Sequence, residues 1–167
     1  IHRGVAWILS MQNRDGGWSS FDKDNQCQPL TYFPFADHNA MLDPSACDIT
    51  GRVLELLGRR GYTRGDLPVR RAVAFLRAHQ EPDGTWFGRW GVNYLYGTWL
   101  ALRGLKAVGE SLTAARYQRA GAWLLAHQNA DGGWGETIAT YEDPQLAGQG
   151  PSTAAQTAWA LLGLLTL

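Results

Sequence analysis

Apolar residues recur at helical spacing along most of this chain, and the pattern divides it into six segments. The first segment places Val5, Ile8 and Leu9 at three- and four-residue intervals, the spacing of one face of an α-helix. Strand-like alternation is absent, and the connecting segments are rich in Gly, Asp and Asn, which favour turns. We therefore expect an all-α protein. The predicted helices cover residues 3–12, 46–58, 68–79, 93–108, 113–127 and 152–167.

Residue types at the ends of these segments support the assignment. Thr113 stands where a helix N-cap is expected, and Ser152 begins the last segment. Gly58 and Gly61 follow the second segment, and Gly109 follows the fourth, as expected for glycine just beyond a helix.

The charged residues alternate between the predicted helices. The third helix carries three Arg and one His and the fifth carries two Arg and one His, whereas the fourth carries two charged residues and the sixth carries none. An outer amphipathic layer around a more buried inner layer would produce this alternation. We therefore expect helical hairpins curved toward an α/α-barrel. Residues 19–45 form a long exception whose aromatic content favours a functional loop over a disordered one.

One short motif occurs three times and makes this a repeat protein. A Gln is followed six positions later by a Trp, with a Gly two residues before the Trp, and each copy ends a predicted helix. A basic residue and, four positions later, an aromatic residue precede each Gln. The copies run from Gln12 to Trp18, from Gln80 to Trp86 and from Gln128 to Trp134.

The repeated motif predicts a structural clasp. Its Asp-Gly turn accepts positive φ without penalty, so the Trp ring can return over the Gln amide at the end of the preceding helix. The Gln amide can then hydrogen-bond backbone groups at helix termini. Truncating a buried Trp typically costs roughly 3–5 kcal/mol, so three such residues can fasten a helical shell.

Composition excludes several classes of protein. Hydrophobic residues make up 45% of the chain and charged residues 18%, as in a globular protein with a core. The net charge is zero, which argues against a nucleic-acid partner. Residues 154–167 are too short to span a bilayer. The chain opens on Ile1 and its last helix has no stop signal, so we expect residues 1–167 to be one partial domain of a longer protein.

Several residue groups suggest chemistry, each with a plainer alternative. Asp48 and Arg52 are four apart with the acid first, the favourable order for a helical pair. Phe21 and Trp90 are aromatic residues that either pack in a core or line a cavity. Cys27, Cys47, His38 and Asp48 match no standard zinc spacing, so we expect no metal.

The repeated motif resembles the glutamine–tryptophan repeat of triterpene cyclases, in the form Arg/Lys-x3-aromatic-x4-Gln-x3-Gly-x-Trp. Five further segments resemble the bacterial squalene–hopene cyclases, and the likeness covers essentially all of the chain. These segments are FDKDN (21–25), DITGRVLELLG (48–58), WFGRWGVNYLYGT (86–98), YEDP (141–144) and STAAQTAWALLGL (152–164).

This resemblance implies a piece from the C-terminal half of a longer enzyme. In that family an α/α-barrel encloses a hydrophobic cavity, where squalene is protonated and cyclised through carbocations to hopene or hopanol without a cofactor. The family's acid is an Asp-x-Asp-Asp motif, which would lie upstream of Ile1. Asp22 and Asp24 belong to a different motif, Asp-Lys-Asp-Asn, and we interpret them as loop structure.

The resemblance also assigns roles to individual residues. Asp48, Arg52 and Tyr96 match positions that support the acid. Some family members carry His in place of Arg52, and Arg cannot shuttle a proton, although its charge can strengthen a neighbouring acid.

Two further pairs of positions match the family's cavity. Phe21 and Trp90 match aromatic positions whose ring faces attract a cation. Phe35 and Ala36 match a constriction of the substrate channel.

Squalene is therefore the implied partner, with peripheral contact on the cytoplasmic side of a bacterial inner membrane and scope for a homodimer. Two other readings stay open. One is an α/α-barrel like the β-subunit of protein prenyltransferases, which would need a zinc triad. The other is a helical-repeat module that binds lipids without catalysis.

Overall fold

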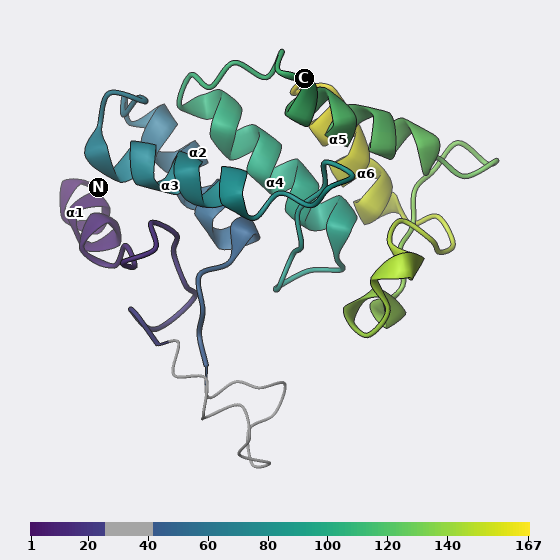
Figure 1. The fold of residues 1–167 in the computed structure, drawn as a ribbon, viewed down its shortest axis with the longest axis horizontal. Helices are drawn as coiled ribbons and strands as arrows, with labels where there is room; N and C mark the ends of the chain where they lie inside the picture. The colour runs from purple at the N-terminus through teal and green to yellow at the C-terminus, as the bar shows by residue number, and fades with distance from the viewer. Residues whose placement is uncertain (26–41) are drawn as a thin grey trace.

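The computed structural model describes residues 1–25 and 42–167, and the described residues form helices and loops without a β-strand (Figure 1). Six α-helices and two short 3-10 helices follow one another along this part of the chain. They are α1 (His2–Ser10), α2 (Cys47–Arg59), α3 (Leu67–Ala78), α4 (Tyr94–Ala107), α5 (Ala115–Ala126), η3 (Ile138–Tyr141), η4 (Pro144–Leu146) and α6 (Ala154–Leu164).

All six predicted helices are present, with ends within three residues of those expected, but some predicted end signals were wrong. Ala114, not Thr113, is the N-cap of α5, and Thr153 caps α6 by accepting the N–H of Gln156. Gly58 lies inside α2 rather than after it, where a Cβ atom would meet the carbonyl of Ala107 in α4. The 3-10 helices had no periodic signal, since each is a single turn.

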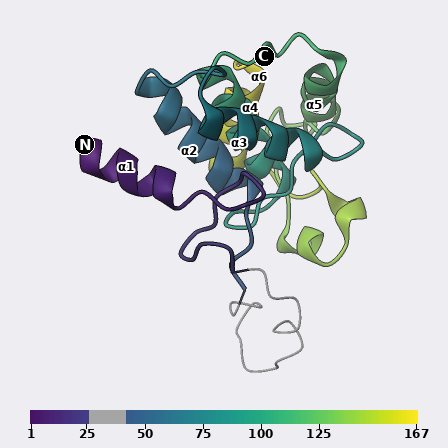
Figure 2. The ribbon, with the colours of Figure 1, turned by 60° about the vertical axis from the view of Figure 1, so that its left-hand side comes forward.

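The helices form the two layers that the charge alternation predicted. α4 lies between α2 and α6 and contacts both. In front of this inner layer, α3 packs on α2, and α5 packs on α4 and α6 (Figure 1). α1 lies at the edge of the molecule far from α5 and α6 in both views (Figures 1 and 2).

Glycines allow α2 and α4 to approach closely. A Cβ atom added to Gly51 would lie 2.4 Å from the carbonyl oxygen of Leu100, and one added to Gly104 would lie 2.4 Å from that of Gly51. Both distances are far below van der Waals contact. The two helices therefore meet backbone to backbone.

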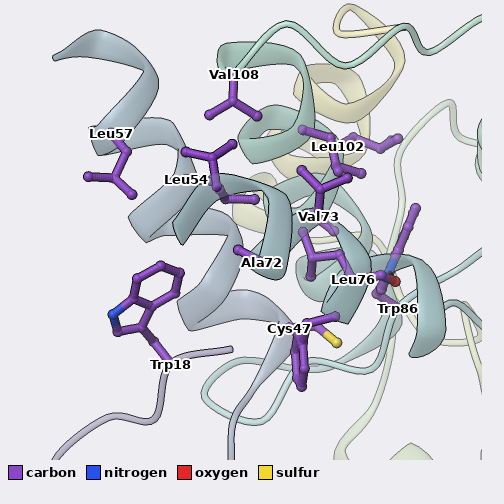
Figure 3. Packing of buried hydrophobic residues seen from close by; sticks show 14 of the residues in the cluster. Trp18, Cys47, Leu54, Leu57, Ala72, Val73, Leu76, Trp86, Leu102 and Val108 are labelled. Atoms are coloured by element: carbon purple, nitrogen blue, oxygen red, sulfur yellow. Dashed lines mark hydrogen bonds between the residues drawn. The ribbon is translucent and has the colours of Figure 1, made fainter. Parts of the chain in front are cut away.

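A continuous apolar core lies between α2, α3 and α4. Figure 3 shows Leu54 of α2, Leu76 of α3 and Leu102 of α4 converging, and all three side chains are fully buried. A second cluster between α4, α5 and α6 includes Leu95 and Trp134. The outer helices therefore contribute one apolar face each, as their amphipathic sequences require.

The three repeated loops, which we call the Gln–Trp loops (residues 12–18, 80–86 and 128–134), share one hydrogen-bond pattern. Each indole N–H donates to a carbonyl in the last turn of the preceding outer helix, four residues before the Gln. Each Trp backbone N–H donates to a Thr hydroxyl in the next inner helix. The indole bonds are Trp18–Ile8, Trp86–Leu76 and Trp134–Leu124, all 2.7 Å, and the Thr bonds are Trp18–Thr50, Trp86–Thr98 and Trp134–Thr157, all 3.0 Å.

The Gln amides extend the clasp to the next outer helix. Gln12 Nε2 donates to the carbonyl of Gly16 in its own turn and to that of Pro68 in the first turn of α3, both at 2.8 Å. Gln80 repeats this with Gly84 and with Arg116 in α5. The Gln amides therefore hydrogen-bond backbone carbonyls as predicted, and those of Gln12 and Gln80 also link successive outer helices.

Candidate functional site

The two predicted cation-stabilising residues lie together at one end of the inner layer. Phe21, in the loop after the first Gln–Trp loop, meets Trp90, in the loop before α4, edge to face with ring centroids 5.6 Å apart. The guanidinium of Arg89 lies 5.7 Å from the Trp90 ring. Phe21 is 73% exposed and Trp90 47% exposed, so both rings present accessible aromatic surface.

Asp48 fixes the backbone of Trp90. One carboxylate oxygen accepts the Trp90 N–H at 2.8 Å, and the other accepts the N–H of Ile49 at 3.0 Å. Asp48 is fully buried at the start of α2. Burial raises the pKa of its carboxyl above the ordinary value, and the hydrogen bonds from Trp90 and Ile49 oppose that rise.

The predicted ion pair between Asp48 and Arg52 is wrong for the described structure. Asp48 points to the Trp90 loop, whereas Arg52 Nη2 donates to the hydroxyl of Tyr96 at 2.6 Å. The Arg52 guanidinium also lies 5.5 Å from the centre of the Tyr96 ring. Long-range partners from α4 and its preceding loop therefore replace the local helical pair.

Tyr96 links this polar pair to an aromatic cluster that sequence reasoning missed. Its ring contacts Trp99 on α4 and Trp159 on α6, at centroid distances of 6.0 and 4.9 Å, and the two indoles stack with planes 6° apart. The signal available in the sequence was weak, because Trp99 and Trp159 lie 60 residues apart in helices that read simply as apolar.

Asp43 is a second missed residue, and it orders the loop that carries Phe21. Its carboxylate is buried and accepts the backbone N–H groups of Ser20, Phe21 and Asp22 at 3.1, 2.5 and 2.7 Å. A single carboxylate therefore holds three consecutive residues of the Phe21 loop.

The Asp-Lys-Asp-Asn segment forms loop structure, in line with the interpretation from sequence. Asp24 has a positive φ of 57° and accepts the backbone N–H of Arg14 at 2.7 Å. Asp22 accepts from the Asn25 amide at 3.0 Å. The predicted channel residues Phe35 and Ala36, together with Cys27 and His38, lie outside the described residues.

The described side chains form no group of three His, Cys, Asp or Glu close enough to hold a metal ion. Within residues 1–25 and 42–167, every helix is too short or too polar to cross a bilayer. The site offers aromatic ring faces beside an arginine–tyrosine pair and a buried carboxylate. Ring faces attract a cation and provide no lone pair to capture it.

Comparison of the sequence with known proteins identifies the family of this chain. The family model for the squalene-hopene cyclase C-terminal domain matches residues 1–167. Squalene–hopene cyclase from Alicyclobacillus acidocaldarius is 48% identical over 163 residues, which are 98% of this chain and 26% of that enzyme. Dammaradiene synthase from Dryopteris crassirhizoma is 47% identical over 184 residues, which are 99% of this chain and 27% of that enzyme.

The fold agrees with a solved structure. ent-Copalyl diphosphate synthase from Streptomyces platensis matches with a TM-score of 0.56 and 26% identity, over 95% of this chain and 30% of that one. The chain spans about a quarter of the length of the two sequence relatives. With a family model that covers it from end to end, the chain belongs to the squalene–hopene cyclase family, as part of that family's C-terminal α/α-barrel domain.

Proposed function

We propose that this chain is part of a triterpene cyclase that converts squalene to hopene or hopanol by protonation followed by carbocationic ring closure. The observation that carries the proposal is the pair of accessible aromatic rings, Phe21 and Trp90, held by buried carboxylates in a member of this family. The rings would stabilise successive cations as the polyene folds. The initiating acid would come from another part of the protein.

Arg52 and Tyr96 have a supporting role in this proposal. An arginine side chain cannot relay a proton, so Arg52 with Tyr96 would set the potential around the initiating acid. A nearby positive charge favours the ionised form of a carboxyl and thus makes it a stronger acid. Asp48 would act by positioning Trp90, which its contact with the Trp90 N–H supports.

The substrate would reach this site from a membrane. Squalene is an apolar molecule that dissolves in the bilayer, so we propose peripheral membrane contact for the whole protein.

Turnover of squalene by the full-length protein tests the proposal, with products identified by mass spectrometry. Trp90→Ala should shift products toward incompletely closed rings, whereas Trp90→Phe, which keeps a ring face, should shift them less. A desolvated cation–π contact of up to about 2 kcal/mol corresponds to roughly a 30-fold change in the ratio of late to early products.

Trp7→Ala is the matched control, because Trp7 is 61% exposed on the outer helix α1. Its product pattern should equal that of the wild type. An unchanged pattern for Trp90→Ala would remove Trp90 from the site. If the wild type leaves squalene unchanged, the proposed reaction is wrong. A dammaradiene as the product would support a triterpene cyclase and correct the product, since a dammaradiene synthase is as similar to this chain as a hopene cyclase.

A further inference from the structure

The loop that carries Trp90 is also held by residues 136–141, a segment to which the sequence motifs assign no role. This segment leaves the third Gln–Trp loop and contains η3. Three of its side chains, those of Glu136, Thr140 and Tyr141, reach residues 88–95, more than 40 positions earlier in the chain.

Glu136 caps α4 from a distance. Its buried carboxylate accepts the backbone N–H groups of Asn93, Tyr94 and Leu95 at 3.1, 3.2 and 3.0 Å. These N–H groups begin α4 and have no intrahelical partner, and a negative charge is favoured at a helix N-terminus. The side chain of Asn93, the local N-cap, does not cap the helix. The start of α4, and with it Tyr96, is therefore fixed by Glu136.

Gln156 of α6 holds Glu136 in place. Its amide oxygen accepts the Glu136 N–H at 3.1 Å, and its amide nitrogen donates to the Glu136 carbonyl at 2.9 Å and to the Val92 carbonyl at 3.3 Å. The cap is thus anchored to the inner layer by a paired contact with a second helix.

Tyr141 holds the other side of the Trp90 loop. Three carbonyl oxygens converge on its hydroxyl, those of Gly91 at 2.9 Å, Gly88 at 3.2 Å and Arg89 at 3.3 Å. A phenol has one proton, so it donates mainly to the nearest oxygen and stays within reach of the others. The Tyr141 ring also meets Phe87 edge to face at 5.7 Å.

Thr140 adds a third contact from the same segment, because its hydroxyl accepts from the Asn93 amide at 3.3 Å. The backbone around Trp90 is therefore held by contacts from two separate elements. Asp48 accepts the Trp90 N–H. The Tyr141 hydroxyl donates to the carbonyl of Gly91, the residue after Trp90, and lies 3.3 Å from that of Arg89, the residue before it.

We propose that residues 136–141 form a clamp whose contacts with the 88–95 loop position Trp90 and Tyr96 and thereby set how far ring closure proceeds. The assignment of this outcome rests on the proposed cyclase function. Glu136 and Tyr141 are positioning residues, since they act through the backbone that carries the aromatic ring. Loss of the clamp leaves the rings chemically intact and allows Trp90 to move away from the developing cation.

Tyr141→Phe in the full-length protein tests the clamp, because it removes one hydroxyl and keeps the ring against Phe87. Tyr117→Phe is the matched control. It also removes a hydrogen-bonded hydroxyl, but that hydroxyl contacts Arg77 and Glu110 rather than the loop. Glu136→Gln is a second variant that keeps an acceptor oxygen and removes the charge at the helix start.

Two readouts are needed, namely amide hydrogen exchange in residues 88–95 and the product ratio from squalene. Tyr141→Phe should raise exchange in this loop about five- to tenfold, the change expected for one lost hydrogen bond of ordinary strength, and should increase early-terminated products. Glu136→Gln should raise exchange at residues 93–95 in the same direction. Tyr117→Phe should leave both the loop exchange and the product ratio at wild-type values.

Unchanged loop exchange in both Tyr141→Phe and Glu136→Gln overturns the clamp. Raised exchange with a wild-type product ratio overturns its role in ring closure. An equal product shift in Tyr117→Phe shows a general loss of stability and also overturns that role. If the wild-type protein does not convert squalene, the proposed function fails, and the exchange measurement alone still supports or overturns the clamp.

Discussion

Three threonine hydroxyls allow the contribution of each Gln–Trp loop to the free energy of unfolding to be compared within one protein. Thr50, Thr98 and Thr157 each accept the backbone N–H of a Gln–Trp loop tryptophan at 3.0 Å. The bonds are alike in length and geometry but differ in their surroundings. Thr50 and Thr98 are fully buried, whereas Thr157 is half-buried. Replacement of each by Val keeps the branched shape and removes the acceptor.

The loss of stability depends on whether water can reach the tryptophan backbone N–H once the threonine hydroxyl is gone. At Trp86 it has no access to water, so Thr98→Val should lower the free energy of unfolding by roughly 1–3 kcal/mol, the cost of an unsatisfied buried donor. Thr50→Val should have the same effect through Trp18. At Trp134 water can replace the hydroxyl, so Thr157→Val should cost about 1 kcal/mol or less, the net value of an exchanged hydrogen bond.

Chemical denaturation of the protein, followed by tryptophan fluorescence, measures these differences. Thr113→Val is the control, because Thr113 is exposed and a surface substitution usually changes stability by less than about 0.5 kcal/mol. Equal losses at Thr98 and Thr157 would show that burial of the bond does not set its contribution. If Thr98→Val leaves the free energy of unfolding unchanged, the stability of this loop depends on the indole contact alone.

Two further predictions concern the packing of the inner layer and a buried charge. Gly104→Ala should lower the midpoint of thermal unfolding and cost roughly 1–3 kcal/mol, because its Cβ would lie 2.4 Å from the Gly51 carbonyl oxygen. Gly4→Ala is the control and should be neutral or slightly stabilising, because a Cβ there would have nothing within 4 Å. Equal effects of the two substitutions would refute this prediction. For Glu110, burial favours a higher pKa, but hydrogen bonds from Arg77 and Tyr117 and the charges of Arg77 and Arg64 outweigh it and lower the pKa. Its stabilising contribution is therefore complete above its ordinary pKa, about 4.3, and is lost as pH falls through the lowered value. The urea midpoint of the wild type should exceed that of Glu110→Gln at pH 7, and the difference between the two proteins should be smaller at pH 3. An equal difference at both pH values would contradict this.

Local patterns in the sequence predicted the helices and the clasps because both depend on short-range spacing. Apolar periodicity defines each helix, and the Asp-Gly turn returns each Trp to the helix that it has just left, ten residues earlier. The threonine partners were not predictable in this way. They follow their tryptophans by 32, 12 and 23 residues, so no fixed spacing marks them.

The site shows the same division between local and distant contacts. Phe21 and Trp90 were singled out by resemblance, and the structure brings them together. The pairing of Asp48 with Arg52 was inferred from helical spacing and was wrong, because the free N–H of a loop 42 residues away and a hydroxyl 44 residues away are better partners. Spacing on one helix cannot reveal a competitor on another element.

The scaffold motif and the site are parts of one mechanical unit. Trp86 ends the second Gln–Trp loop, and its backbone N–H binds Thr98 in α4. The intervening residues 87–97 contain both Trp90 and Tyr96, so one clasp bond closes the loop that carries the candidate chemistry. The Trp86 indole anchors this loop to α3 through Leu76, and Asp48 anchors it to α2. The repeat that links the helical layers therefore also holds the two ends of the loop that carries Trp90 and Tyr96. Residues 136–141 add contacts to residues within that loop.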